Sequence, residues 1–264
     1  MTKYAAFEMT AVTSFSGVRA IAAEWAELHA TSATTNPYTH PSWMLTWAEH
    51  FVAEDDLCIL TARRDGRLLG VAPLYWAHLG RRRRMAFRAL HLLGNGRCAQ
   101  FTEIPGVLAG RDEYRAVFKE TVAYLQHEAP AWDWVKLTVD TQQGWFEPSW
   151  LAKTTKARSS FDVHQDTRAC VLIDLPESWE QFLAARKGKT RQAIRRDFSR
   201  LDQRIGDWSI DVVPAGADRT GALDRTIDLS RARSGRTDKL RHPTVFGQES
   251  AAPFYRDAVG AMAA

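Results

Sequence analysis

The stretch LCILTARRDGRLLGVAPLYW, residues 57–76, decides the fold class of this chain. Two runs rich in β-forming residues flank Asp65-Gly66-Arg67, and an Asp-Gly pair between such runs is a strong signal for a tight hairpin. The segment therefore predicts two antiparallel strands joined by this turn. A sheet that begins in this way needs further layers to cover its apolar residues.

The segments around this hairpin supply both helices and strands. Residues 17–30 and 42–51 have helical apolar spacing, and Ser42 is expected to cap the second helix. Residues 88–94, 101–109 and 132–140 have strand patterns, whereas residues 111–128 predict an amphipathic helix. The apolar stripe of that helix comprises Tyr114, Val117, Phe118, Val122 and Leu125. The order helix, helix, four strands, helix, strand predicts an α+β (α/β layered) fold with a mixed sheet flanked by helices.

The pattern then restarts in the last hundred residues. Residues 169–176 read as a strand, and Ser178 with Gln181 forms a capping box at the start of a helical stretch that Gly188 breaks in two. A strand at 208–215 and helices at 222–235 and 253–264 follow. We therefore expect a duplicated architecture, with a first domain at 1–165 and a C-terminally incomplete second one at 166–264.

Composition excludes several classes of protein. The 264 residues include 10 Trp, 12 Phe and 6 Tyr, too much aromatic surface for a disordered chain. The three cysteines (Cys58, Cys98 and Cys170) form no CxxC motif, which fits a reducing compartment. The sequence has neither the apolar core of a signal peptide nor an apolar run of about 20 residues, so we expect a cytoplasmic protein without membrane insertion. No metal-ligand spacing is present among the eight His, so no metal is expected.

Basic residues are concentrated in one predicted helix. Residues 186–200 hold seven Lys and Arg and only one acid, Asp197, in a chain with 27 Arg and 8 Lys and a net charge of +4. Helical geometry places four basic residues on one face: Arg186, Lys189, Arg196 and Arg200. An apolar stripe on which the helix would dock lies about 120° away and comprises Ile194, Phe198, Leu201 and Ile205. The basic face is either solvated or a site for the phosphates of a coenzyme or nucleotide sugar. Nucleic acid is not expected, because the rest of the chain is nearly charge-balanced and carries no nucleic-acid-binding signature.

Residues 94–99, GNGRCA, match the pattern G-x-G-x-x-A. A dinucleotide site would need a helix to begin at these glycines, but the strand-like QFTEIPG follows. We therefore expect a turn between strands. His91 and Cys98 lie close in sequence, but nothing in the residues supports a thiolate pair.

Three stretches together resemble a known family. They are WAEL with NPYTHPSWMLTWAEHF, then LCILTARRDGRLLGVAPLYW, then SWEQFLAARKGKTRQAIRRDFSRLDQRIG, within residues 20–206. Their order and spacing resemble the GNAT superfamily of acyl-CoA-dependent acyltransferases. More narrowly, they resemble the CelD/BcsL-type proteins of cellulose or exopolysaccharide biosynthesis, which are similar to the tandem-GNAT Fem-type transferases.

The resemblance implies two GNAT-like halves, of which the first is degenerate and the second binds acetyl-CoA or another acyl-CoA. It also implies N- or O-acyl transfer to a sugar or amine acceptor. The place of the family's pyrophosphate loop in the first half is 107–113, which has one glycine and two acids where phosphates would lie. No residue matches the family's catalytic base.

The candidates for an anionic acceptor or coenzyme phosphate lie in the basic segment: Arg186, Lys187, Lys189, Arg191, Arg195 and Arg196. The alternative is a catalytically inactive GNAT-fold scaffold that recognises a sugar nucleotide or a protein partner. An incomplete second sheet would expose strand edges, so a homodimer is also expected.

Overall fold

The computed structural model describes residues 7–32, 36–79, 87–96, 101–128, 132–137, 173–214, 217, 219–236 and 243–263. Contacts divide the chain into two units, residues 1–161 together with 215–264, and residues 162–214. The C-terminal helices thus belong to the same unit as the N-terminal sheet. The duplicated second copy stays a prediction.

A mixed sheet forms the centre of the first unit. Its strands lie in the order β1-β2-β3-β4-β6, with β5 paired to β3. All pairs are antiparallel except β4 and β6, which run parallel. The strands are β1 (Glu8–Val12), β2 (Leu57–Arg64), β3 (Arg67–Leu79), β4 (Phe87–Leu92), β5 (Leu108–Ala109) and β6 (Trp134–Lys136).

The predicted hairpin is confirmed as β2 and β3. Asp65 and Gly66 have φ values of 52° and 77°, the left-handed conformation that a two-residue hairpin turn requires at both positions. The strand expected over 101–109 shrinks to Leu108–Ala109, because residues 101–107 are irregular and only the last two residues pair with β3. β1 was not predicted, since five residues with only partial burial give a weak alternation.

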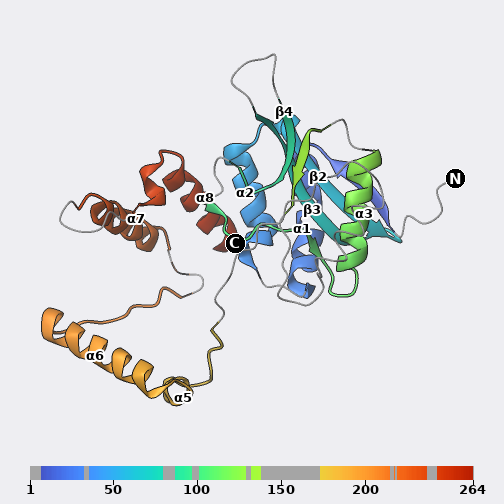
Figure 1. Cartoon of the computed structure of the whole chain (residues 1–264). Helices are drawn as coiled ribbons and strands as arrows, with labels where there is room; N and C mark the ends of the chain where they lie inside the picture. The colour runs from blue at the N-terminus through green and yellow to red at the C-terminus, as the bar shows by residue number, and fades with distance from the viewer. Residues whose placement is uncertain are drawn as a thin grey trace. The chain divides into compact units, whose positions relative to one another are not determined.

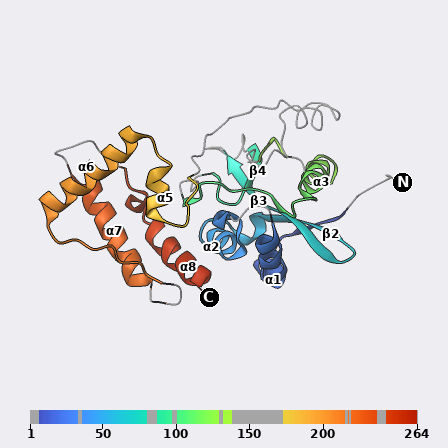
Figure 2. The same ribbon diagram turned by 90° about the horizontal axis from the view of Figure 1, so that it is seen from below.

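Helices cover both faces of this sheet (Figures 1 and 2). α1 (Phe15–Thr31) and α2 (Pro41–Phe51) lie on one face, and α3 (Tyr114–His127) lies on the other. All five residues of the predicted α3 stripe are buried. The fold class is therefore confirmed as α+β, with a mixed sheet flanked by helices.

The caps of the first two helices follow local chemistry. Ser14 caps α1 by accepting a hydrogen bond from the amide of Gly17. The expectation that Ser42 caps α2 was wrong. His40 occupies the cap and its Nδ1 accepts from the amide of Ser42, because Pro41 takes the first helical position, where no N–H is needed.

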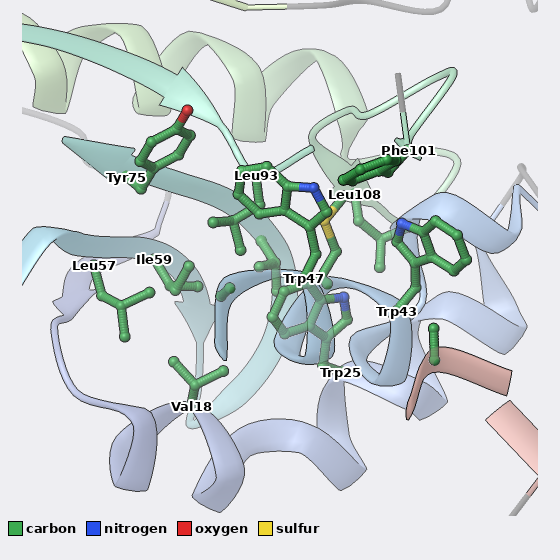
Figure 3. Packing of buried hydrophobic residues seen from close by; sticks show 14 of the residues in the cluster. Val18, Trp25, Trp43, Trp47, Leu57, Ile59, Tyr75, Leu93, Phe101 and Leu108 are labelled. Carbon is green, nitrogen blue, oxygen red and sulfur yellow. The ribbon is translucent and has the colours of Figure 1, made fainter. Parts of the chain in front are cut away.

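An aromatic core lies between the sheet and the α1/α2 layer. Trp25 and Trp47 are almost fully buried there with Met44 and Ile59. Figure 3 labels Trp25, Trp47 and Ile59 within this core. α8 (Ala251–Ala263) adds Phe254, whose ring packs at 5.1 Å from that of Trp43. α8 also pairs with α7 (Thr220–Ser234) through the Arg256–Asp224 ion pair at 2.8 Å. The C-terminus of the described chain thus completes the N-terminal core.

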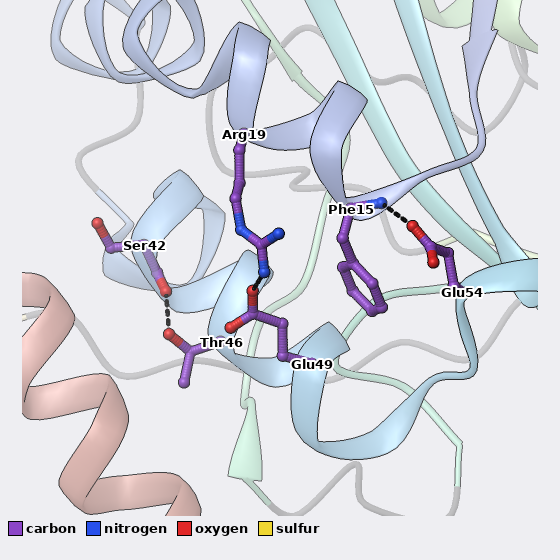
Figure 4. A network of polar contacts seen from close by, with 6 residues as sticks. All are labelled: Phe15, Arg19, Ser42, Thr46, Glu49 and Glu54. Carbon is purple, nitrogen blue, oxygen red and sulfur yellow. Dashed lines mark hydrogen bonds and ion pairs between the residues drawn. The ribbon is translucent and has the colours of Figure 1, made fainter.

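Polar contacts fix α1 against α2 and against the start of β2 (Figure 4). Arg19 forms an ion pair with Glu49. The amide of Phe15, at the start of α1, donates to Glu54 at 2.9 Å. These contacts hold the α1/α2 layer in register over the sheet.

The second unit is described by α5 (Trp179–Ala184) and α6 (Gly188–Ile205). The predicted capping box is confirmed at its first contact, since the Ser178 hydroxyl accepts from the amide of Gln181. The predicted break before Gly188 is confirmed as well. Residues 173–176 and 208–214, which were expected to belong to strands, have no strand in the described chain.

Candidate functional site

A row of polar side chains crosses three strands of the sheet. Tyr75 on β3 pairs with His91 on β4, and His91 pairs with Lys136 on β6. Cross-strand partners share a face, and Tyr75 belongs to the core on the α1/α2 face. Because β4 and β6 are parallel and the row lies near their last residues, it marks the carboxyl end of the parallel pair. Open sheets commonly bind ligands at such ends.

His91 is held in one orientation by Trp134. The indole Nε1 of Trp134 donates a hydrogen bond to Nε2 of His91 at 3.2 Å, and the two ring planes lie 15° apart. An indole nitrogen can only donate, so Nε2 must accept through its lone pair. The contact therefore assigns the neutral imidazole with its proton on Nδ1.

The Nδ1–H of His91 has no hydrogen-bond acceptor in the described structure. The side chain is buried, with only 7% of the residue exposed. A buried donor without an acceptor costs about 1–3 kcal/mol, so each such group needs an explanation. Trp47, whose ring centroid lies 5.5 Å from that of Tyr75, also has a buried N–H without an acceptor.

Burial keeps His91 neutral. Desolvation lowers the pKa of the imidazole below its ordinary value of 6.5, and the nearby positive charge of Lys136 lowers this pKa further. The ring therefore stays neutral at physiological pH. A neutral ring in a fixed tautomer can act as a hydrogen-bond donor through Nδ1.

A tight turn closes over the row. The hydroxyl of Tyr75 donates to the carbonyl of Asn95 at 2.9 Å. Gly94 and Gly96 have φ values of 87° and 92°, which glycine adopts without strain. A Cβ at Gly96 would lie 2.4 Å from the Tyr75 hydroxyl and 3.5 Å from Nδ1 of His91. The expected turn is confirmed at residues 93–96; Cys98 and the rest of the G-x-G-x-x-A pattern lie outside the described residues.

The loop before α3 is poorly suited to phosphate. Ala109 ends β5, and the carboxylate of Glu113 lies 2.8 Å from where a Cβ of Gly110 would be. Glu113 is also the N-cap residue of α3, so a negative charge already occupies the end of the helix where an anion would bind. The pyrophosphate of a coenzyme would meet a like charge here.

The predicted basic residues all lie in the second unit, around the junction of α5 and α6. Two of them serve the local structure. The guanidinium of Arg186 lies 4.2 Å from the ring centroid of Phe182, and Arg191 donates to the carbonyl of Arg186 at 2.9 Å, near the end of α5. The remaining four are exposed and have no ion-pair partner in the described chain: Lys187, Lys189, Arg195 and Arg196.

None of the described side chains of α6 is buried, and the expected docking of the helix through its apolar stripe stays a prediction. Phe198, which shares this stripe with Ile194, Leu201 and Ile205, is 42% exposed and packs against the rings of Trp179 and Trp208. Ile205 is 63% exposed.

A groove lies between α2 and α8 in the first unit. Its charged side chains are already paired, because Glu49 binds Arg19 and Asp257 lies 2.8 Å from His50. Arg256 likewise pairs with Asp224. This groove therefore has no spare charge for a ligand.

Sequence reasoning did not find the His91 row. Strand alternation could have placed His91 on the same face as Ala89, and Trp134 on the same face as Lys136. Nothing in the sequence says that β4 and β6 are neighbours and parallel, and only that pairing brings Trp134 to His91.

No group of three or more metal-binding side chains occurs among the described residues. None of the described helices is long and apolar enough to cross a membrane.

Comparison with known proteins gives little. No family model matches the chain, and no curated protein matches it. One solved structure to which the chain is similar is the ribosomal-protein-alanine N-acetyltransferase from Brucella melitensis biovar Abortus 2308, with 16% sequence identity. The match covers 63% of this chain and 98% of the acetyltransferase chain. Its TM-score of 0.31 is too low to carry an argument. The function must therefore be inferred from this chain's own residues.

Proposed function

We propose that this chain is a GNAT-type acyltransferase that moves an acyl group from acetyl-CoA or another acyl-CoA to a sugar or amine acceptor. The observation that carries the proposal is the parallel pair β4 and β6 in an otherwise antiparallel sheet, with a buried His91 at its carboxyl end. The sequence resemblance to CelD/BcsL-type proteins supports a sugar acceptor and a role in polysaccharide biosynthesis. In the reaction, the acceptor nitrogen or oxygen bonds to the acyl carbon, the carbon–sulfur bond breaks, and the proton that the acceptor loses ends, through solvent, on the sulfur of the released coenzyme thiol.

We propose the four exposed cations of the second unit as contacts for an anionic acceptor or a coenzyme phosphate: Lys187 and Lys189 lie at the start of α6, and Arg195 and Arg196 lie in its middle. Charge supports this assignment, because Lys187, Lys189, Arg195 and Arg196 have no carboxylate partner in the described chain. Glu113 opposes a phosphate site at α3. Arg186 and Arg191 complete the proposed set, but the contacts they make in the structure are with α5 and the residues that follow its end.

Calorimetric titration of acetyl-CoA into the purified chain tests this function. We expect saturable binding, and a loss of at least tenfold in affinity in the Lys189→Glu, Arg196→Glu double variant. The control is Lys119→Glu with Arg225→Glu, which makes the same change in net charge at exposed positions of α3 and α7. Equal weakening by both double variants would mean that only net charge matters and would sink the phosphate site.

A catalytically inactive scaffold is the second candidate, and the Glu113 carboxylate at the α3 terminus favours it. In that case millimolar acetyl-CoA would not bind, whereas a sugar nucleotide would. A homodimer belongs to either proposal, and light scattering that shows a monomer would contradict it.

A further inference from the structure

We propose that the Nδ1–H of His91 donates a hydrogen bond to the carbonyl oxygen of the acyl group, and that His91 is a positioning donor rather than a general base. The identity of the oxygen rests on the proposed acyl transfer. The donor itself rests on the geometry of the row formed by Tyr75, His91 and Lys136.

The hydrogen bond from Trp134 fixes which nitrogen carries the proton. Trp134 occupies the lone pair of Nε2, so the neutral ring keeps its hydrogen on Nδ1. A general base needs a free lone pair that faces the substrate. Neither nitrogen offers one, because Nε2 is engaged and Nδ1 is already protonated.

A neutral carbonyl is the acceptor that this donor suits. His91 is buried, and an anion bonded to this neutral ring would lose its hydration without gaining a counter-charge from the ring itself. A carbonyl oxygen carries no such penalty and satisfies the N–H that lacks an acceptor.

The turn leaves the side of Nδ1 without a side chain. A Cβ at Gly96 would lie 3.5 Å from Nδ1, so any other residue would place atoms next to the nitrogen. The absence of a side chain allows a small group to approach closely at this point. The Tyr75 hydroxyl donates to the carbonyl of Asn95, and no described atom accepts a hydrogen bond from the Nδ1–H of His91.

The test is nitrogen NMR of the ¹⁵N-histidine-labelled full chain with probes that differ only in the acetyl group. One pair is acetyl-CoA and CoA, which reports the thioester donor. The other is N-acetylglucosamine and glucosamine, which reports the amide product. We expect free His91 to show the Nδ1–H form, and this proton to move downfield with an acetylated probe but not with its partner.

The outcomes separate the two proposals. Binding of acetyl-CoA without a change at Nδ1 of His91 overturns the donor role and leaves acyl transfer standing. Absence of binding by all four probes overturns both. A free His91 in the Nε2–H form also overturns the donor role, whatever binds.

Two variants provide a second measurement. Trp134→Phe removes the N–H that holds Nε2, so the Nε2–H form should appear and the pKa of His91 should rise. Trp132→Phe is the matched control, since its indole donates to the carbonyl of Leu125 instead. His91→Leu should reduce the preference for acetyl-CoA over CoA about fivefold to tenfold, the worth of one hydrogen bond, whereas His91→Asn, which keeps an amide donor near Nδ1, should restore part of it.

Discussion

At the scale of single residues, the turn over the His91 row depends on the glycine at 96. Gly96 combines a left-handed φ of 92° with the Tyr75 hydroxyl 2.4 Å from the place of a Cβ. Gly66 in the hairpin turn has a similar φ of 77° but open space around it. A side chain at Gly66 would therefore meet backbone strain alone, whereas a side chain at Gly96 would meet both backbone strain and a steric clash.

We predict that Gly96→Ala destabilises the protein more than Gly66→Ala does. Gly66→Ala should cost about 1–2 kcal/mol, the strain of a left-handed residue with a Cβ. Gly96→Ala adds the clash with the Tyr75 hydroxyl, and Tyr75→Phe in the same chain should relieve part of the excess. Urea unfolding of the variants measures the difference in the free energy of unfolding. Equal losses of stability at both glycines would show that the turn shifts away from the Tyr75 hydroxyl at no cost.

Residue patterns in the sequence predicted the turn at the glycines of 94–99 but not the candidate site around His91. The strand-like residues after the glycines of 94–99 argued against a dinucleotide-binding loop and predicted a turn. The structure has a turn at residues 93–96. The role of His91 depends on Trp134, 43 residues later, and on a parallel pairing that residue patterns do not encode. The basic segment was visible in sequence, but the local use of Arg186 and Arg191 became clear only from the α5–α6 junction.

At the scale of elements, α8 is the helix whose position the sequence could not reveal. Its apolar spacing predicted a helix, since periodicity is local. Its partner is α2, about 200 positions earlier in the chain, and its Phe254 ring also meets the rings of Phe51 and Phe101. Long-range packing of this kind leaves no mark in a short window of sequence.

We predict that Phe254→Ala destabilises the whole first unit. The side chain is fully buried, so its removal leaves a cavity and should cost about 3–5 kcal/mol. Met262 on the same helix is 39% exposed, and Met262→Ala should cost less than about 1 kcal/mol. Unfolding should be followed by near-ultraviolet circular dichroism of the buried tryptophans. A small effect of Phe254→Ala would mean that α8 does not belong to this core.

At the scale of the whole molecule, buried histidines couple folding to pH. Burial lowers the pKa of His91, and burial together with the neighbouring His29 lowers the pKa of His40, both from 6.5. The unfolded chain therefore binds more protons than the folded chain below about pH 7. The folded state loses stability as the pH falls through 6.5 and towards the lower folded pKa values.

We predict a free energy of unfolding that decreases between pH 8 and pH 5.5. His91→Asn removes one of the two groups and should make the decrease smaller. Met262→Ala, at a partly exposed position of α8, is the control; it removes no titratable group and should keep the slope of the wild type. Urea unfolding at several pH values gives the slopes. Identical slopes in the wild type and His91→Asn would show that the buried ring is not protonated on unfolding in this range.

The place of Phe254 in the core also has a consequence for synthesis. A ribosome makes the sheet residues up to Lys136 long before it reaches α8, about 120 residues later. At roughly 5–20 residues per second, this interval lasts about 6–24 seconds. Throughout that time the nascent chain holds Trp43, Phe51 and Phe101 without the ring that joins them. Until α8 emerges and covers these rings, the newly made sheet exposes aromatic surface of the kind that chaperones bind.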